Sequence, residues 1–425
     1  MTEQREKAIL VGVNLQNEDD FDFQYSMEEL GELAAACDVE VVGQVTQKLD
    51  RVNNSHYIGK GKIEEVAALK EMQDADTVIF DDELSPSQIR NLEADLDCKV
   101  IDRTILILDI FARRAKTREA QMQVEMARLQ YMLPRLVGLR ASLGRQGGGG
   151  GEGLTNRGAG ETKLELDRRR IEAKIAFLRK ELSVHVAQRE VQRRQRKKNE
   201  VPVVSLVGYT NAGKSTIMNG MIELFNESAH KQVFEKNMLF ATLETSIRKI
   251  EQPDRKSYLL TDTVGFVKKL PHHLVKAFRS TLEEAANADL LIHVVDFSNP
   301  HYRQMIQTTN ETLKEMDIEG VPTLIVYNKA DQTGEEYPRV ENDKIFISAK
   351  KKEGLKELNT EIRKHIFKDY VTCTMLIPFE EGHLVSYFNS NANVTSASYE
   401  EEGTLLKMEC RLADYEKYKQ YVIAK

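Results

Sequence analysis

The segment GYTNAGKS, Gly208–Ser215, restricts the possible fold more than any other feature of this chain. It follows an apolar run, VVSLV, and it precedes a helical pattern, STIMNGMIEL. A strand, a glycine-containing loop and a helix in this order are typical of a P-loop, in which backbone amides and a helix N-terminus surround phosphate oxygens. A chance match on a structural loop is the alternative, and the flanking elements argue against it. We therefore expect an α/β domain with a phosphate site at the carboxyl end of a parallel strand.

Each residue of this loop has an expected role. Gly208 and Gly213 allow the backbone amides to turn toward the phosphates, and Lys214 supplies positive charge to the β and γ oxygens. Ser215 offers a hydroxyl to Mg²⁺. The other loop residues are expected to line the same nucleotide site: Tyr209, Thr210, Asn211, Ala212 and Thr216. Asn211 is in addition a candidate ligand for a monovalent cation such as K⁺, and a structural hydrogen bond is the alternative.

The motif DTVG, 262–265, follows the strand-like run SYLLT. Asp262 is expected to hold Mg²⁺ through water, and the Gly265 amide to sense the γ-phosphate. Thr263 and Val264 lie between them and are also expected to line the nucleotide site. The motif is weak alone, because an ordinary turn would look similar, but it is informative downstream of a P-loop.

Two further motifs indicate which base is bound. In NKAD, 328–331, the Asp331 carboxylate can accept two hydrogen bonds from guanine N1–H and the 2-amino group, a donor pair that adenine lacks. Asn328 is expected to hold the base loop, and the stem of Lys329 to cover the ring. In SAK, Ser348 to Lys350, the Ala349 amide is expected to face guanine O6. The four motifs in this order predict GTP, and not ATP, as the ligand.

A threonine that contacts Mg²⁺ and the γ-phosphate is expected between the P-loop and Asp262. The segment LFATLETS offers Thr242 and Thr245, and Thr242 is preferred as the threonine that grips Mg²⁺ and the γ-phosphate, with an ordinary loop threonine as the alternative. The expected catalytic residues are Lys214, Thr242 and Gly265. The expected metal ligands are Ser215, Thr242 and Asp262.

Phe266 stands where many GTPases have a glutamine that orients the attacking water. Because phenylalanine cannot hydrogen-bond water, we expect slow intrinsic hydrolysis that a partner stimulates. His272 and His273 follow nearby, and one of them could act on water. Helix capping or simple exposure is the alternative for both.

Patterns of apolar residues divide the 425 residues into four expected domains. Residues 1–102 alternate strands and helices, which predicts a small α/β domain with a parallel sheet. Residues 103–198 carry two apolar stripes at helical spacing and predict an antiparallel hairpin. Residues 199–368 contain the near-continuous apolar strands of a doubly wound, mostly parallel sheet. Residues 369–425 follow a β-α-β-β-α order, as in a small α+β domain.

The tip of the expected hairpin, residues 144–160, is GRQGGGGGEGLTNRGAG and holds nine of the 24 glycines. It lacks the GK[ST] ending of a P-loop, and it joins two helices. Residues 103–200 contain 23 Lys and Arg but only 11 Asp and Glu, although the whole chain has a net charge of -7. A basic segment of this kind is suited to RNA, and a solvated helical face or plain linker is the alternative.

Composition also restricts location. The four cysteines are far apart and form no CxxC motif, which favours thiols in a reducing cytoplasm. No apolar run is long enough to span a membrane, and the N-terminus lacks the layout of a signal peptide. We expect a cytoplasmic protein, monomeric in solution.

Beyond the nucleotide motifs, the chain resembles the HflX family of GTPases over nearly its whole length. The resemblance rests on family-specific stretches: YIGKGKIEE (57–65), FDDELSPSQIRNLE (80–93), IDRTILILDIFARRA (101–115), GRQGGGGG (144–151), GAGETKLELDRRR (158–170) and DTVGFVKKLPHHLVKAF (262–278). The chain departs from the family pattern in ATLET, where ATLDPT is expected, and in GRQ, where SRQ is expected. The C-terminal segment matches only in kind.

The resemblance implies a GTPase that binds the large ribosomal subunit and dissociates ribosomes under stress. It also implies that the hairpin, through residues 140–170, reaches ribosomal RNA near the peptidyl transferase centre. Lys60 and Lys62 are a second candidate RNA contact, or else only a turn at a helix start. Two other functions stay open: a regulatory GTPase that binds a protein through the hairpin, and an RNA-binding module in which hydrolysis is incidental.

Overall fold

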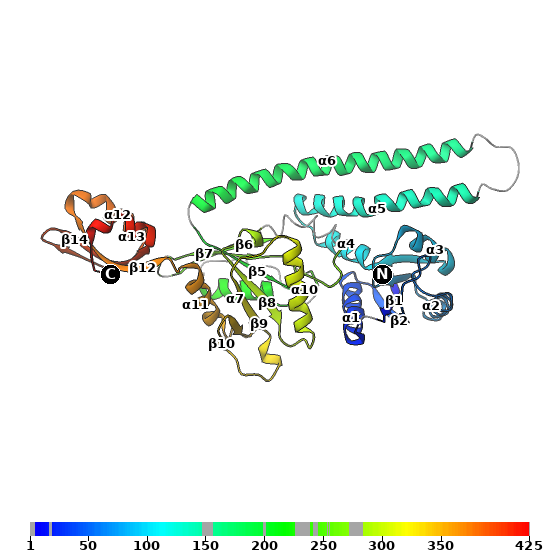
Figure 1. Cartoon of the computed structure of the whole chain (residues 1–425), viewed down its shortest axis with the longest axis horizontal. Coiled ribbons are helices and arrows are strands. Elements are labelled where there is room, and N and C mark those ends of the chain that lie inside the picture. The colour runs from blue at the N-terminus through cyan, green and yellow to red at the C-terminus, as the bar shows by residue number, and fades with distance from the viewer. Residues whose placement is uncertain are drawn as a thin grey trace.

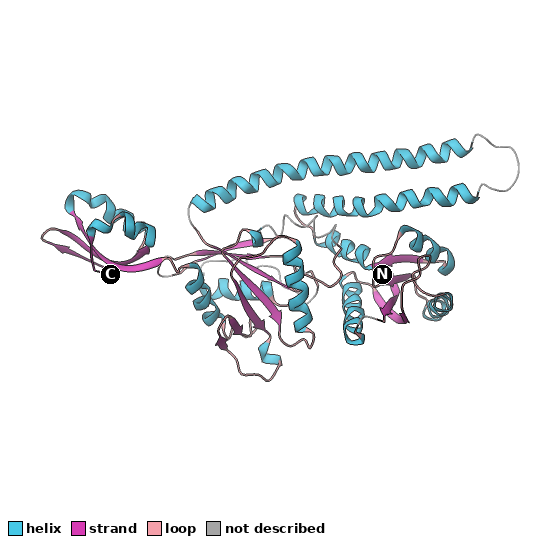
Figure 2. Ribbon diagram, in the orientation of Figure 1, coloured by secondary structure: helices cyan, strands magenta, loops and turns pink. Residues whose placement is uncertain are grey.

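The computed structural model describes residues 5–16, 19–146, 156–198, 201–225, 239–240, 245–252, 254, 256–271 and 284–424. For residues 136–146, 156–164 and 192–198 it describes the backbone alone. Three sheets follow one another along the chain, and a long helical hairpin lies between the first and the second in sequence (Figures 1 and 2). Within the described residues, none of the helices has the length and apolar character that crossing a membrane requires.

The N-terminal sheet is parallel, with strand order β2-β1-β3-β4. Its strands are β1 (Lys7–Leu15), β2 (Glu40–Leu49), β3 (Thr77–Phe80) and β4 (Lys99–Asp102). Its helices are α1 (Asp20–Ala36), α2 (Lys60–Gln73), α3 (Pro86–Leu96) and α4 (Arg103–Arg114). Successive residues of β1 point to opposite faces: Ala8 and Leu10 lie in a core with α1 and α4, and Ile9 and Val11 in a core with α2 and α3. The predicted α/β domain is confirmed.

Helix α4 was expected to belong to the hairpin, but it packs on the N-terminal core instead. Asp102 is the last residue of β4 and the N-cap of α4, where its side chain accepts a hydrogen bond from the Ile105 amide at 3.0 Å. The chain therefore passes directly from the sheet into the helix. Leu106, Ile107 and Phe111 are then buried beside α1. The hairpin itself begins at Arg118.

The hairpin consists of α5 (Arg118–Gln146) and α6 (Asn156–Lys198). Met122 on α5 and Ile175 and Leu178 on α6 are buried, as the apolar stripes predict. The expected tip, 144–160, is too long, because helix continues to Gln146 and resumes at Asn156. An isolated glycine costs a helix only about 1 kcal/mol, so Gly144, Gly158 and Gly160 do not stop it. The glycine run 147–151 lies outside the described residues.

The central sheet has the order β10-β11-β9-β8-β5-β7-β6. Its strands are β5 (Val203–Gly208), β6 (Ser246–Ile250), β7 (Tyr258–Asp262), β8 (Leu290–Asp296), β9 (Thr323–Asn328), β10 (Arg339–Glu341) and β11 (Lys344–Phe346). Helices α7 (Lys214–Phe225) and α11 (Leu355–Ile366) cover one face, and α10 (Tyr302–Glu315) packs on the other. The doubly wound, mostly parallel sheet is confirmed. The antiparallel edge strands β6 and β10 were not predicted, because edge strands are short and polar.

The C-terminal sheet has the order β13-β14-β12-β15 and is antiparallel. It contains β12 (Tyr370–Pro378), α12 (Gly382–Asn391), β13 (Asn393–Glu400), β14 (Gly403–Arg411), α13 (Leu412–Lys417) and β15 (Val422–Ala424). The predicted β-α-β-β-α order is followed by one further strand, because the last helix ends at Lys417 and the chain continues into β15. The final residues pair with β12, where Val422 faces Met375, because the free edge of β12 satisfies their backbone groups.

Candidate nucleotide site

The P-loop connects β5 to α7, as the sequence predicts. Gly208 has φ +140° and Gly213 has φ +95°, conformations that only glycine adopts without strain. A Cβ at Gly208 would lie 2.2 Å from the carbonyl oxygen of Val294, and one at Gly213 would lie 2.2 Å from Asn328 Nδ2. Both positions therefore need glycine for close approach of the chain as well as for φ.

Lys214 is buried at the start of α7. Its Nζ donates hydrogen bonds to the carbonyl oxygens of Gly208 and Tyr209, at 3.0 and 2.8 Å. Burial lowers the pKa of Lys214 to about 8, and the Asp262 carboxylate acts in the opposite sense. An ammonium group with so few polar partners is well suited to phosphate oxygens.

Raising the pH should weaken GTP binding through Lys214. The protonated form, which binds phosphates, predominates below pH 8 and is lost as the pH rises above it. We expect the Kd for GTP to be about tenfold larger at pH 9 than at pH 7, measured by titration with a fluorescent analogue. Guanosine has no phosphate and serves as the control. If its affinity falls in parallel, Lys214 is not the group responsible.

Ser215 and Asp262 form the candidate metal site. The Ser215 hydroxyl donates a hydrogen bond to Asp262 Oδ2 at 2.6 Å, and Asp262 is fully buried at the end of β7. A hydroxyl and a carboxylate are the hard oxygen donors that Mg²⁺ takes beside phosphate, so this pair fits the ion.

The DTVG segment lies directly against the P-loop. The Thr210 amide donates to the Phe266 carbonyl at 2.8 Å, and the Phe266 amide donates to the Gly208 carbonyl at 3.2 Å. Thr263 is fixed by its hydroxyl, 2.6 Å from the Leu206 carbonyl oxygen, and Val264 is buried. A Cβ at Gly265 would lie only 2.9 Å from Lys214 Nζ. Gly265 is thus placed beside the lysine that would meet the γ-phosphate.

The side chains of Tyr209 and Phe266 point away from the phosphate site. Both are buried in a core with Tyr25 and Leu291, so Phe266 cannot orient water. Asn211 has φ +61° and Thr216 is partly exposed, both on the P-loop side of α7. Thr210 Oγ1 is buried with no hydrogen-bond partner within the described part of the chain.

Asn328 joins the base loops to the P-loop. Its Nδ2 donates to the Ala212 carbonyl at 2.9 Å, and its Oδ1 accepts from the Ala349 amide, also at 2.9 Å. One side chain at the end of β9 thereby fixes the P-loop and the SAK loop together. Ser348 is buried next to Ala349 and its hydroxyl accepts a hydrogen bond from the Lys351 amide at 3.3 Å, whereas Lys350 is exposed.

Lys329 and Asp331 complete the base side. Asp331 lies in the short helix Ala330–Gln332 that follows β9. Lys329 Nζ contacts Asp296 Oδ2 at 2.7 Å, which holds the lysine stem across the carboxyl ends of β8 and β9. Asp296, the last residue of β8, was not predicted, although an aspartate at the carboxyl end of a buried strand is a usable signal. Thr242, His272 and His273 lie outside the described residues, and Thr245 immediately precedes β6.

These features define a P-loop GTPase, with a guanine-type base loop, joined to an α/β domain and a helical hairpin. Three family models match the chain: "GTP-binding GTPase N-terminal" over residues 24–112, "GTP-binding GTPase Middle Region" over 114–196 and "50S ribosome-binding GTPase" over 203–329. The GTPase HflX of Caldanaerobacter subterraneus subsp. tengcongensis is 43% identical over 99% of this chain and 94% of its own. That of Escherichia coli K12 is 38% identical over 94% and 92%. The chain therefore belongs to the HflX family of GTPases.

Among solved structures, a GTP-binding protein from the archaeon Sulfolobus solfataricus in complex with GDP is 24% identical. The alignment covers 85% of this chain and 99% of that chain, with a TM-score of 0.43. The family relationship thus rests on sequence.

Proposed function

We propose that this GTPase binds the large ribosomal subunit and dissociates stalled ribosomes under stress. The observation that carries the proposal is the basic hairpin α5–α6, which extends away from the nucleotide site in the same chain (Figure 1). The family model for the GTPase domain, described as "50S ribosome-binding GTPase", supports the choice of partner. We place the protein in the cytoplasm as a monomer. Its functional units are the N-terminal domain through α4 (1–114), the hairpin (118–198), the GTPase domain (199–368) and the C-terminal domain (369–425).

The arginines of α6 are available for RNA. Arg168, Arg169 and Arg170 pair with acidic residues three or four positions away on the same helix, at 2.8, 2.7 and 3.4 Å. Such exposed pairs contribute little to stability and are easily exchanged for phosphate contacts. Residues 140–170 are proposed to meet ribosomal RNA near the peptidyl transferase centre.

In the proposed hydrolysis, this chain positions GTP and stabilises the negative charge that develops on its phosphates. Lys214 and the P-loop amides stabilise charge on the β and γ oxygens, and Gly265 donates its amide to the γ-phosphate. Ser215, Asp262 and Thr242 would hold Mg²⁺, which supplies charge neutralisation at the phosphates. Asn211 would hold K⁺ beside them. Because Phe266 is buried, ordering of the attacking water is assigned to a contact made on the ribosome.

Adding purified large subunits should raise GTP hydrolysis at least tenfold over the intrinsic rate. The reason is that the chain offers no hydrogen-bonding side chain at position 266 to orient water. Phosphate release under multiple turnover is the measurement, and small subunits are the control. An unchanged rate with large subunits, together with stimulation by another partner, would contradict the proposal.

Salt dependence separates RNA from a protein target. Binding through phosphate contacts should weaken steeply between 50 and 200 mM salt, by about 10³-fold for six contacts. If the hairpin instead engaged a protein through its apolar stripes, affinity would change little, and a regulatory GTPase would be the better description.

A further inference from the structure

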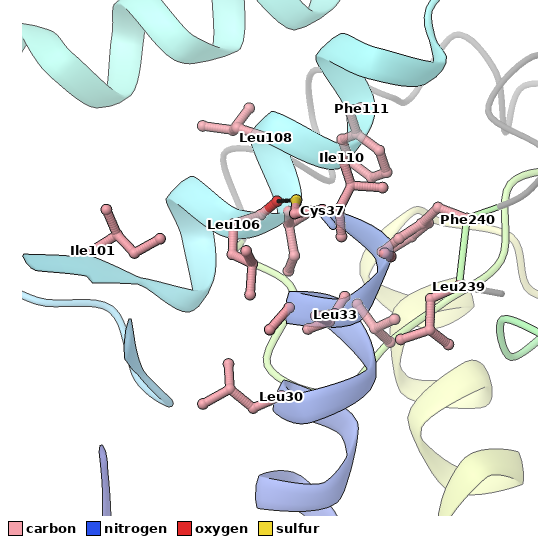
Figure 3. Close-up of a cluster of buried hydrophobic side chains, with 14 of the residues drawn as sticks. Leu30, Leu33, Cys37, Ile101, Leu106, Leu108, Ile110, Phe111, Leu239 and Phe240 are labelled. Atoms are coloured by element: carbon pink, nitrogen blue, oxygen red, sulfur yellow. Dashed lines mark hydrogen bonds between the residues drawn. The ribbon is translucent and has the colours of Figure 1, made fainter. Parts of the chain in front are cut away.

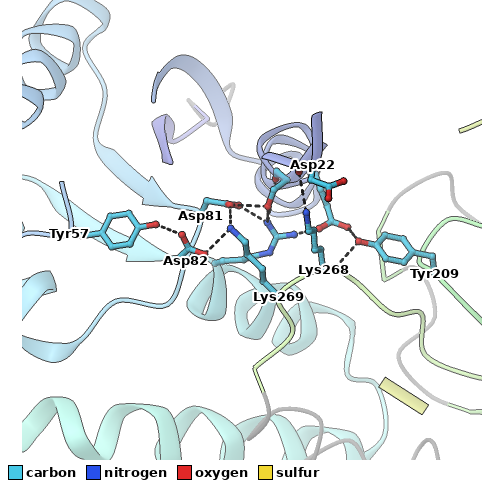
Figure 4. A network of polar contacts seen from close by, with 10 residues as sticks. Asp22, Tyr57, Asp81, Asp82, Tyr209, Lys268 and Lys269 are labelled. Carbon is cyan, nitrogen blue, oxygen red and sulfur yellow. Dashed lines mark hydrogen bonds and ion pairs between the residues drawn. The ribbon is translucent and has the colours of Figure 1, made fainter. Parts of the chain in front are cut away.

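The N-terminal domain contacts the segment of the GTPase domain that follows the DTVG motif. Lys269 Nζ lies 2.5 Å from Asp81 Oδ2 and 2.7 Å from Asp82 Oδ1, in the loop after β3 (Figure 4). Asp81 is fully buried, and the side chain of Lys269 is 24% exposed. Only three residues therefore separate Gly265, which lies beside Lys214, from a residue that forms an ion pair with a different domain.

Tyr209 connects the same domain to the P-loop. Its hydroxyl donates a hydrogen bond to Glu29 on α1 and accepts one from the Lys268 amide at 2.6 Å (Figure 4). Glu29 also pairs with Arg103, which lies 2.6 Å from Asp81. The P-loop, the segment after DTVG and the N-terminal domain thus share one buried polar network.

A second contact joins the N-terminal domain to the chain before Thr242. Leu239 and Phe240, just before the segment predicted to grip the γ-phosphate, are buried in the core formed by α1 and α4. The Phe240 ring meets Phe111 edge-on, with centroids 4.6 Å apart, near Leu33 and Cys37 (Figure 3). The N-terminal domain therefore contacts the chain at two places, one before Thr242 and one after DTVG.

Gly265 lies close to the P-loop backbone as well as to Lys214. A Cβ at Gly265 would be 2.7 Å from Thr210 Cα as well as 2.9 Å from Lys214 Nζ. In the proposed site a γ-phosphate must fit between the Lys214 ammonium and the Gly265 amide, so Gly265 has to move outward. Residues 266–269 continue from it, and this movement would strain the Lys269 and Tyr209 contacts.

We propose that Lys269 and Tyr209 are positioning residues that hold the DTVG segment close to Lys214 through the N-terminal domain, and thereby favour GDP over GTP. GTP binding and release of Lys269 from Asp81 and Asp82 are then coupled in both directions. A partner that pulls the N-terminal domain away would raise the affinity for GTP. This inference rests on the proposed nucleotide site, in particular on the role of Gly265.

Lys269→Met tests the coupling. We expect the ratio of affinities for a non-hydrolysable GTP analogue over GDP to rise about tenfold, with GDP affinity within a few-fold of the wild type. Tyr209→Phe, which removes only the hydroxyl, should shift the ratio in the same direction and guards against misfolding of the first variant. In an Asp82→Asn background, the effect of Lys269→Met should be smaller, because one of the two partner charges of Lys269 is already lost.

Lys364→Met is the matched control, since Lys364 pairs with Glu361 at 2.6 Å within α11 and its side chain is 63% exposed. Its ratio should equal that of the wild type. A ratio unchanged or lowered in both Lys269→Met and Tyr209→Phe, with GDP still bound, would overturn this inference but not the nucleotide site. Failure of the wild type to bind guanine nucleotides would overturn both.

Discussion

Asp331→Asn is expected to weaken GTP binding at least 100-fold and to create binding of xanthosine triphosphate. Asp331 lies in the short helix after β9, beside Lys329. Its carboxylate can accept hydrogen bonds from both the N1–H and the 2-amino group of guanine. An asparagine amide has an NH2 group in place of one carboxylate oxygen, so two donors would face each other at one of these contacts. Xanthine carries an oxygen in place of the 2-amino group, so the amide matches it. Competition against a fluorescent GDP analogue gives both affinities.

The matched control for this base switch is Asp343→Asn. Asp343 is an exposed aspartate of the same domain, with 74% of its side chain accessible, in the turn between β10 and β11. It should leave the preference for GTP unchanged. Retention of wild-type GTP affinity in Asp331→Asn would mean that the base is recognised elsewhere, although the P-loop assignment would stand.

The sequence predicted those parts of the site that depend on local geometry. The P-loop could be predicted because its flanking strand, β5, and helix, α7, adjoin it in sequence. Its glycines also permit the positive φ angles that the loop adopts. Asp262 and Asn328 were correctly placed at strand ends, since parallel strands of one sheet bring their carboxyl ends together. Pattern and spacing carry this information without any knowledge of distant contacts.

The contacts between domains could not be predicted in the same way. Tyr209 was assigned to the nucleotide, but its side chain meets Glu29, which is 180 positions away in the sequence. Lys269 and Asp81 are 188 positions apart. Nothing in the sequence near either residue indicates its partner, because a buried ion pair is specified by tertiary packing. The same holds for β15, whose three residues form a strand only because β12 has a free edge.

Asn328→Ala is expected to lower the affinities for GTP and for GDP alike, each by about 100-fold. The substitution removes the donor to the Ala212 carbonyl and the acceptor for the Ala349 amide, both buried and both 2.9 Å away. Each buried group left without a partner costs about 1–3 kcal/mol, and 100-fold corresponds to about 2.7 kcal/mol. Since the P-loop and the SAK loop contact opposite ends of the proposed nucleotide, losing their link should affect phosphate and base together. Calorimetric titration measures it.

Asn359→Ala separates this effect from general loss of stability. Asn359 is also buried, on α11, where its Oδ1 accepts a hydrogen bond from the Tyr258 hydroxyl at 2.9 Å, away from the P-loop. Both variants should lower the free energy of unfolding by about 1–3 kcal/mol, but only Asn328→Ala should lose nucleotide affinity. Equal loss of affinity in the two variants would show that Asn328 acts through stability alone. A selective loss would establish that one amide side chain holds the phosphate loop and the guanine loop in register.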